Sequence, residues 1–384
     1  MKFAHLGDCH LGGWHQPELK ELNFQSFREA LSRCKKERVD FILISGDLFD
    51  SAYPPIDTLK QTFEEFRKLK EEKINVYLIA GSHDYSVSGK TFLDVLEKSG
   101  FAKNVSHFEE KNNQLILEPT LHENIAIYGY PGKKSGLEVD ELKNVKIHDS
   151  PGMFKILMLH TTIKDAIGNI PVNSVDDEKL PKVDYLALSH LHINYVKPGR
   201  AYSGPIFPNN LSELEELEGG TFCVFENGKI RREEIKIKKI LPIHLEITNA
   251  LIATENILTL LENEELEDKI IIVRLSGILE KGKISDIDFP RIEEFVKNKN
   301  AYVFLKSTSK LHTEDSEIQI DTANTEQIES KIIKNFEEKN PNTFNSLIPE
   351  LIRSLSIEKL EDETASTFED RLFSDIKRFI NYEI

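Results

Sequence analysis

Acidic and imidazole side chains follow the first apolar segment of the sequence at a spacing that suits metal binding. Phe3–Leu6 predicts a short strand, and Asp8-Cys9-His10 comes directly after it. Side chains two residues apart beyond a strand point the same way, because strand side chains alternate with period two. One carboxylate oxygen and one imidazole nitrogen aimed at a single point suit a borderline metal such as Mn, Fe or Zn. Alone, this pair is a weak signal.

Four more apolar segments of the sequence end in similar polar groups. These groups are Asp47 and Asp50; Ser82, His83 and Asp84; His160; and His190 and His192. Packing gives no reason for independent strands to carry so many aspartates and histidines to one sheet edge. Such groups would repel one another there unless cations organised them. The whole set therefore predicts a metal centre.

Two ions fit this inventory better than one, because it exceeds the ligands of a single four-coordinate site. The expected ligands are Asp8, His10 and His192 for one ion, and His160 and His190 for the other. Asp47 is the natural bridge, since bridging carboxylates keep two ions about 3.5–4 Å apart. That separation suits an in-line displacement at phosphorus, with a water as the nucleophile.

The loop after the third predicted strand offers a group for proton transfer. His83 follows a glycine and a serine at the end of that strand and is not needed as a ligand. It is placed to donate a proton to a leaving oxygen. Asp50 or Asp84 could orient an imidazole by hydrogen bonding. Catalytic roles are therefore expected for His83, Asp50 and Asp84.

The elements that carry these groups repeat in the order strand, polar loop, helix. Helices are expected over 24–36 and after Pro54-Pro55, and continuous apolar runs predict buried strands at 41–44, 76–80, 156–159 and 185–188. Two hairpin-like strands are expected near 115–117 and 125–130, and antiparallel strands at 222–225 and 230–240. This order predicts an α/β layered sheet sandwich with its loops gathered at the C-terminal strand edges.

Changes in the sequence pattern predict the boundaries of the domains. We expect the catalytic domain to span 1–239 and a small α+β capping domain to span 240–306. A polar linker is expected over 307–333. The last segment, 334–384, contains two apolar-striped helices, the second opened by a capping box at Ser366 and Glu369. Helices this short either pack back on the body or bind a partner.

Composition limits the class of protein. With 39% hydrophobic and 30% charged residues the sequence is typical of a soluble globular chain. No apolar run reaches the roughly 20 residues that cross a bilayer. With no export signal visible and three scattered cysteines, a reduced cytoplasmic or nucleoid-associated protein without membrane partners is expected. The net charge of −16 argues against wholesale electrostatic binding to nucleic acid. Any contact with DNA would need bound cations at the site and local basic patches, for which Lys133-Lys134 and the Arg200 loop are candidates.

The five polar groups together resemble the motifs of the calcineurin-like metallophosphoesterase superfamily. Its pattern is D-x-H, G-D-x-x-D, G-N-H-D/E, H and G-H-x-H. The sequence has the same blocks in order: Asp8-Cys9-His10, Gly46-Asp47-Leu48-Phe49-Asp50, Gly81-Ser82-His83-Asp84, His160 and Ser189-His190-Leu191-His192. The resemblance implies the layered α/β fold of that superfamily and adds the Ser82 position to the metal ligands.

Within the superfamily, MKFAHLGDCHLG and ISGDLFDSAYPP are similar to the Mre/SbcD group of nucleases that act in DNA double-strand-break repair. The resemblance is specific over roughly residues 1–210 and only architectural beyond them. It implies two Mn²⁺ per chain, exonuclease action on duplex DNA and endonuclease action on single strands. It also implies a partner, an SMC-like ABC ATPase of the Rad/SbcC type bound through the C-terminal helices. A homodimer is implied through two apolar stripes, Leu59/Phe63/Phe66 and Phe92/Leu93/Leu96.

The sequence departs from the family pattern at two places. Ser82 replaces a ligating asparagine, and its shorter hydroxyl is a weaker donor to metal. Ser189 replaces a glycine, a milder change. Two alternatives to the nuclease therefore stay open. One is a small-molecule or cyclic-nucleotide phosphodiesterase with the same metal core, which the acidic charge favours; the other is a catalytically weak scaffold at DNA ends.

Overall fold

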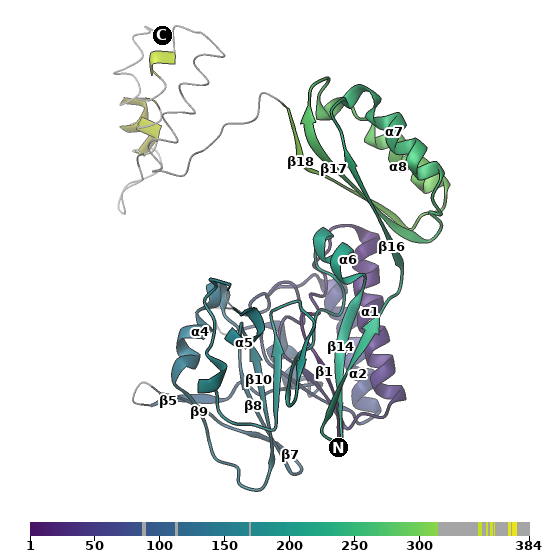
Figure 1. Ribbon diagram of the computed structural model, residues 1–384. Helices are drawn as coiled ribbons and strands as arrows, with labels where there is room; N and C mark the ends of the chain where they lie inside the picture. Colours follow the sequence, from purple (N-terminus) through teal and green to yellow (C-terminus); the bar gives the residue numbers. More distant parts are fainter. Residues whose placement is uncertain are drawn as a thin grey trace. The chain divides into compact units, whose positions relative to one another are not determined.

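The computed structural model describes residues 1–86, 90–111, 114–168 and 170–313, together with 345–347, 351, 354–355, 357, 368–369 and 371–374. The chain divides into two compact units. Met1–Gly277 with Lys281–Lys310 forms the first, and Ile278–Glu280 with Leu311–Ile384 forms the second. The elements that position the candidate site all belong to the first unit (Figure 1).

The first sheet carries the N-terminal motifs. Its strands run in the order β15 (Lys229–Ile235), β14 (Gly220–Glu226), β1 (Lys2–Leu6), β2 (Phe41–Ile44), β3 (Asn75–Leu78) and β4 (Lys103–Asn104). β1 to β4 are parallel, and β14 is antiparallel to β1 as expected from its pattern. The parallel strands place the loops after β1, β2 and β3 at one edge of the sheet.

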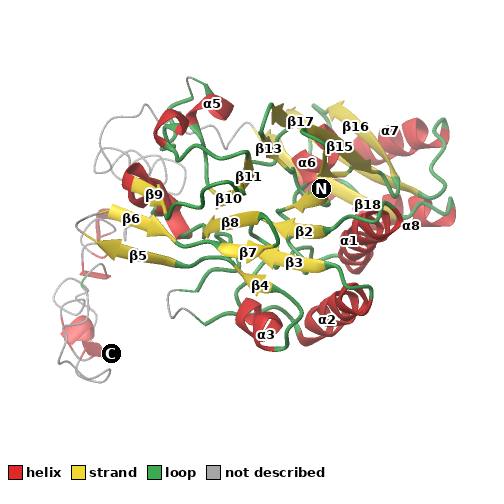
Figure 2. Ribbon diagram, turned by 90° about the horizontal axis from the view of Figure 1, so that it is seen from below, coloured by secondary structure: helices red, strands yellow, loops and turns green. Residues whose placement is uncertain are grey.

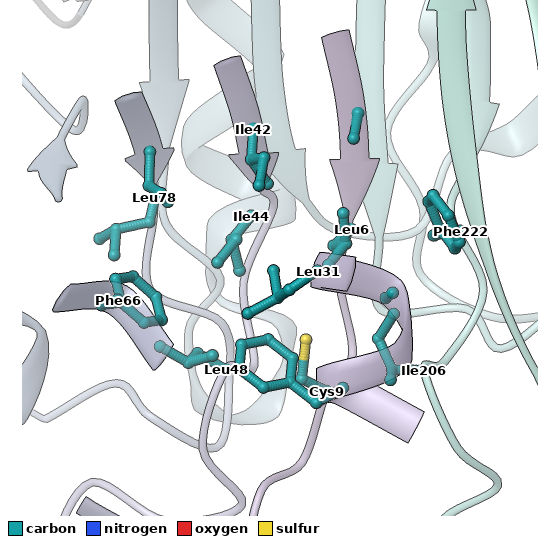
Figure 3. Packing of buried hydrophobic residues seen from close by; sticks show 14 of the residues in the cluster. Leu6, Cys9, Leu31, Ile42, Ile44, Leu48, Phe66, Leu78, Ile206 and Phe222 are labelled. Carbon is teal, nitrogen blue, oxygen red and sulfur yellow. The ribbon is translucent and has the colours of Figure 1, made fainter. Parts of the chain in front are cut away.

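Helices cover the outer face of this sheet, namely α1 (Pro17–Lys36), α2 (Ile56–Glu71) and α3 (Phe92–Lys98). Helix α1 starts at Pro17 instead of Phe24, because proline is favoured at a first helical position and Glu18 suits the positive end of the helix dipole. Figure 3 shows Leu31 of α1 and Phe66 of α2 packed against Leu6, Ile44 and Leu78 of the strands.

The second sheet carries the C-terminal motifs. Its order is β12 (Tyr195–Lys197), β13 (Arg200–Tyr202), β11 (Tyr185–Ser189), β10 (Phe154–His160), β8 (Ile125–Tyr130) and β7 (Thr120–His122). The expectation of a hairpin between 115–117 and 125–130 was wrong. β6 (Gln114–Leu117) pairs with β5 (Phe108–Lys111) and β9 (Val145–Ile147), whereas β8 pairs with β7 and β10. The helical turns near this sheet are η1 (Lys134–Gly136), α4 (Glu138–Glu141), η2 (Leu142–Asn144), α5 (Lys164–Ile167) and η3 (Asp177–Lys179).

The two six-stranded sheets pack face to face as a sandwich. Phe3, Phe41 and Tyr77 from the first sheet share one buried cluster with Met158 and Tyr185 from the second. Their neighbours in sequence face outward, so these strands are buried on both faces, which explains their continuous apolar runs. Figure 2 shows the helices α1, α2 and α3 beside the strands of the first sheet. This is the α/β layered fold expected from the sequence.

A three-stranded sheet follows the sandwich. It contains β16 (Lys239–Glu246), β17 (Lys269–Leu279) and β18 (Val303–Thr313), with α7 (Ala250–Glu262), α8 (Phe289–Asn298) and the turn η4 (Ile284–Asp286). Its elements match the small α+β module expected after residue 239. β18 runs to Thr313, so the expected linker was wrong over 307–313, where the chain is a strand. The domain boundaries themselves stay a prediction.

The expected dimer stripes lie largely in the core. Phe66, Leu93 and Leu96 are fully buried, and Leu59, Phe63 and Phe92 pack partly buried against the same cluster. These stripes therefore stabilise the first sheet, while the homodimer stays a prediction. Apart from the turn η6 (Asn345–Leu347) and a few other positions, the expected C-terminal helices fall outside the described residues. No helix in the described part of the chain has the length and apolar composition that a bilayer crossing requires.

Candidate metal centre

Loops from the C-terminal edges of both sheets meet at one point. The main-chain N–H of Asp8 donates to the carbonyl of Gly46, and that of His10 donates to the carbonyl of Asp47. Across the sandwich, the N–H of His190 lies 3.0 Å from both carboxylate oxygens of Asp8. Asp8, His10 and Asp47 have φ values of 48°, 43° and 50°. The left-handed region is uncommon for residues other than glycine, and such conformations gather at functional sites.

Two glycines allow this close approach of the loops. A Cβ at Gly46 would lie 2.4 Å from Nδ1 of His160, and one at Gly81 would lie 2.2 Å from Oδ1 of Asp47. Gly46 also has a φ of +108°, which side-chain-bearing residues rarely adopt. Larger residues at these positions would displace the polar groups, so glycine in both motifs has a steric cause.

Three imidazoles each turn their Nδ1 atom toward an oxygen acceptor. Nδ1 of His10 lies 3.1 Å from Oδ1 of Asp50, and Nδ1 of His192 lies 2.9 Å from Oε2 of Glu213. Nδ1 of His160 lies 3.2 Å from the carbonyl oxygen of Ser45. Each Nδ1–H can donate to its acceptor, which leaves each Nε2 with a free lone pair. This is the arrangement by which proteins prepare histidine as a metal ligand.

The three Nε2 atoms face the same small space. Nε2 of His10 lies 3.3 Å from Nε2 of His192, and Nε2 of His160 lies 3.2 Å from Oδ2 of Asp47. The Nε2 atom of His160 is buried and has no hydrogen-bond partner among the described residues, because its contact with Asp47 is poorly aligned. Lone pairs and carboxylate oxygens this close repel one another unless a proton or a cation lies between them. The residues therefore fit a bound divalent metal.

The pKa values of these groups also indicate that the centre favours a positive charge. Burial opposes a charge on His160, but the carboxylate of Asp47 outweighs it and raises the pKa of His160 to about 9. Burial alone would raise the pKa of Asp47, yet the imidazoles of His160 and His10 hold it well below its usual value. Burial and the nearby His160 lower the pKa of His190 to about 4. A cation at this point would satisfy the carboxylates that now attract protons.

Three groups of side chains bring their ligand atoms within 4.8 Å of one another: Asp8, His10 and His192; Asp8, Asp47 and His160; and His10, Asp50 and His83. The first group is the set expected for one ion. Asp47 lies between His10 and His160, at 3.8 Å and 3.2 Å from their Nε2 atoms, a position suited to a bridge. His190 is in none of these groups, although its ring centroid is 5.1 Å from that of His160.

The loop after β3 holds His83 at the exposed side of the centre. Its Nδ1 lies 3.1 Å from the carbonyl oxygen and 3.3 Å from Oδ1 of Asp50. The hydrogen bond to Asp50 raises the pKa of His83 to about 9. Asp50 therefore orients two imidazoles, His10 and His83. The Oγ atom of Ser82 lies 3.5 Å from Oδ2 of Asp47, at the margin of the cluster.

Asp84 has a different environment from the one expected. Its carboxylate accepts hydrogen bonds from the main-chain N–H groups of Gly81 and Leu48, at 2.6 Å and 2.8 Å, and touches no imidazole by hydrogen bond among the described residues. It is buried, and burial together with the charge of Asp47 raises its pKa. Asp84 thus joins the loops after β2 and β3, while Asp50 alone orients His83.

Glu213 is a residue of the centre that the sequence did not reveal. It lies on α6 (Leu211–Leu217), where it accepts from His192 and, at 2.8 Å, from the main-chain N–H of Asn209. Asn210 caps this helix through its side chain. The sequence signal Asn-x-x-Glu at 210–213 marks a helix start. It gives no sign that the glutamate faces a histidine from another loop.

Comparison with known proteins agrees with this geometry. A family model described as "Calcineurin-like phosphoesterase" matches residues 1–194, which include every predicted ligand. The DNA double-strand break repair protein Mre11 of Methanocaldococcus jannaschii is 27% identical over 265 residues, 64% of this chain and 70% of that protein. A subunit of the nuclease SbcCD from Staphylococcus epidermidis is 27% identical over 361 residues, covering 82% of this chain and 81% of that subunit.

A third relative has no assigned role. The uncharacterized metallophosphoesterase YhaO of Bacillus subtilis is 30% identical over 238 residues, 57% of this chain and 55% of that protein. The matched region thus spans from about half to four-fifths of these relatives. The family match covers half of the chain and all five loops of the centre. The chain therefore belongs to the calcineurin-like phosphoesterase family, a family of metal-dependent enzymes.

Proposed function

We propose that the protein is a DNA phosphodiesterase that uses two Mn²⁺ ions, cutting duplex ends as an exonuclease and single strands as an endonuclease. The observation that carries this proposal is the convergence of three Nε2 atoms and two carboxylates beside His83. Its similarity to proteins named as a double-strand-break repair protein and as a nuclease subunit favours DNA as the substrate.

Each side chain has a task in this proposal. Asp8, His10 and His192 hold one ion, His160 and His190 hold the other, and Asp47 bridges them, with Ser82 beside the second ion. When bound, divalent ions supply positive charge that polarises a phosphodiester and favours ionisation of a water. The protein's own contribution is to fix these ligands by hydrogen bonds to their Nδ1 atoms.

His83 supplies the proton in this proposal. Its Nδ1 faces Asp50, so the proton available to a substrate is on Nε2. With a pKa raised to about 9, His83 stays protonated at neutral pH and can act as a general acid toward the leaving 3′ or 5′ oxygen. Asp50 keeps the ring in place and stabilises its charge. Asp84 supports the loop through its main-chain hydrogen bonds.

The proposal is tested by comparing substrates. Purified protein with Mn²⁺ should degrade linear duplex DNA and cut single-stranded circles, and a chelator should stop both reactions. Hydrolysis of a small chromogenic phosphodiester or a cyclic nucleotide without any DNA cleavage would instead support the alternative that the net charge of −16 favours. Metal binding without turnover of any diester would support the scaffold alternative.

We also propose an ATPase partner of the Rad/SbcC type, bound through residues 334–384, and a homodimer. Deletion of the residues after Asn340 should preserve Mn²⁺-dependent cleavage, because every proposed ligand lies before residue 194. The same deletion should abolish capture of the ATPase subunit. Retained capture would show that the tail belongs to the fold of the protein and not to the partner interface.

A further inference from the structure

A pocket opens directly beside His83; it shares Asp50, Ser82 and His83 with the candidate metal centre and extends beyond them. It has a volume of about 540 Å³ and is lined by residues 50–53, 82–83, 85–86 and 134–135. These residues come from the loops after β2, β3 and β8, so the pocket joins the edges of the two sheets. Pockets that take small organic ligands have volumes of about 300–1,000 Å³. The space is therefore large enough for one unit of a chain-like substrate.

One lysine of this pocket is placed to meet a negative ligand. Lys134 is exposed and makes no ion pair with any described residue. The other basic groups considered from the sequence are already paired: Lys133 lies 2.6 Å from Glu141, and Arg200 lies 2.8 Å from Asp177. In a chain with a net charge of −16, an exposed cation next to the catalytic loop favours an anionic ligand at that place.

Two tyrosines supply a surface for a flat ring. Tyr53 is 69% exposed although it lies in the loop that also carries Asp50, and Tyr85 lies two residues after His83. Leaving a tyrosine so exposed gains nothing for the fold, because its ring buries little apolar area there. Exposed aromatic rings in grooves that bind single strands stack on bases without selecting their sequence. The pocket thus combines an aromatic face with a cation, which is the chemistry that recognises a nucleotide.

We propose that this pocket binds one unpaired nucleotide adjacent to the scissile phosphodiester, with Tyr53 stacked on its base and Lys134 at its phosphate. This inference rests on the proposed nuclease function and narrows its substrate to nucleic acid with an unstacked base. A base inside a duplex has both faces covered by its neighbours, so a duplex end must fray before its nucleotide can enter. The same pocket then serves single strands directly.

Binding of a cleavage-resistant phosphorothioate oligodeoxynucleotide tests the proposal without turnover. Fluorescence anisotropy in Mn²⁺ should give a Kd about tenfold higher for Tyr53→Ala, the loss expected for one stacked base. Lys134→Met should also raise the Kd and should flatten its dependence on salt, by a slope of about 0.7 for one phosphate contact on a single strand. The conservative variants Tyr53→Phe and Lys134→Arg should restore most of the affinity.

The matched control is Lys146→Met, which removes an exposed lysine of β9 outside the pocket lining. Its Kd should equal that of the wild type. Kinetics add a second measurement. For Tyr53→Ala, the ratio of kcat/KM on an oligonucleotide to kcat/KM on a small chromogenic diester should fall about tenfold, because only the oligonucleotide has a neighbouring base.

The outcomes separate the two levels of inference. Wild-type protein that binds and cuts oligonucleotides while Tyr53→Ala and Lys134→Met behave identically to it would overturn the nucleotide pocket and leave the nuclease intact. Wild-type protein that hydrolyses the small diester but neither binds nor cuts oligonucleotides would overturn both. Equal losses in Lys146→Met would show a general charge effect and would also overturn the assignment of Lys134.

Discussion

Replacing Glu213 by alanine should weaken metal binding although this residue is not a ligand. Its Oε2 atom accepts from Nδ1 of His192 at 2.9 Å, and its Oε1 atom accepts from the side chain of Asn210 at 2.6 Å. Burial disfavours a charge on His192, but the hydrogen bond to Glu213 and the charge of Asp8 outweigh it and raise the pKa of His192. Without Glu213, the imidazole can rotate or place its proton on Nε2, and either change removes the lone pair that faces the centre.

The size of the effect follows from the geometry. Outer carboxylates on ligating histidines typically contribute 10–100-fold in metal affinity. The carboxylate of Glu213 is 19% exposed and the ring of His192 is 17% exposed, so water can replace part of the interaction. We therefore expect about a tenfold loss for Glu213→Ala, or about 1.4 kcal/mol. Glu213→Gln keeps an acceptor oxygen but loses the charge, so its loss should be smaller.

Calorimetric titration with Mn²⁺ or Co²⁺ measures this effect directly. Glu215→Ala is the matched control, because Glu215 lies on the same helix and pairs with Arg274 at 2.8 Å instead of with the metal centre. This control should bind metal like the wild type even if it unfolds at a lower temperature. If Glu213→Ala and the wild type bind both ions with equal affinity, then Glu213 does not position His192 and the reasoning fails.

Three further outcomes are expected. His83→Ala should lower kcat on DNA by about 10²–10⁴-fold with metal and DNA affinity retained; equal kcat in both proteins would exclude His83 as the acid. Ser82→Asn should raise the affinity for the second ion in calorimetry, because an amide oxygen reaches further than a hydroxyl, and an unchanged isotherm would place Ser82 away from that ion. Metal binding near neutral pH should release a proton from His160, whose pKa is raised from 6.5 to about 9. Metal affinity should therefore increase as pH rises toward 9. The free energy of unfolding of the metal-free protein should change in the opposite direction. The contribution of His160 to it is complete below pH 6.5 and is lost as pH rises through 9. Calorimetry in buffers of different ionisation enthalpy counts the protons, and a pH-independent affinity would contradict this assignment.

The sequence predicted the parts of the centre that depend on local order. Asp8 and His10 follow β1, and Asp47 follows β2, because short apolar strands and the loops after them can be recognised from neighbouring residues alone. Parallel strands then bring such loops to one edge by geometry. The later histidines, His160, His190 and His192, follow apolar strands in the same way, and the family resemblance added only Ser82 to the ligands. This is why the ligand loops and the layered fold could be expected, while the ligation of each ion stays a prediction.

Features that depend on distant pairing could not be predicted. Glu213 meets His192 across 21 residues, and this contact depends on how α6 packs against α1 and β17. The orientation of Asp84 is decided by N–H groups of another loop, which no local pattern encodes. The strand predicted to pair with 125–130 was also wrong. β8 pairs with β10, an apolar strand more distant in the sequence, and no local pattern indicates that pairing. In each case the sequence indicated the local element but not the residue or strand that it contacts.

Electrostatics connect the acidic character of the chain with its proposed substrate. Asp8 and Asp47 are buried at the centre and Glu213 lies close by, so the metal-free site repels phosphate. Two divalent cations would carry four positive charges against the two negative charges of Asp8 and Asp47, the carboxylates proposed to contact them, so bound metal would make the point of ligation positive. The field of the remaining surface opposes a polyanion, since the net charge is −16. Attraction must then be short-ranged, arising from the ions, from protonated His83 and from the exposed Lys134. Under the proposed nuclease function, such a protein would hold nucleic acid at the point of cleavage and only weakly elsewhere, which would leave the capture of long DNA to the proposed partner.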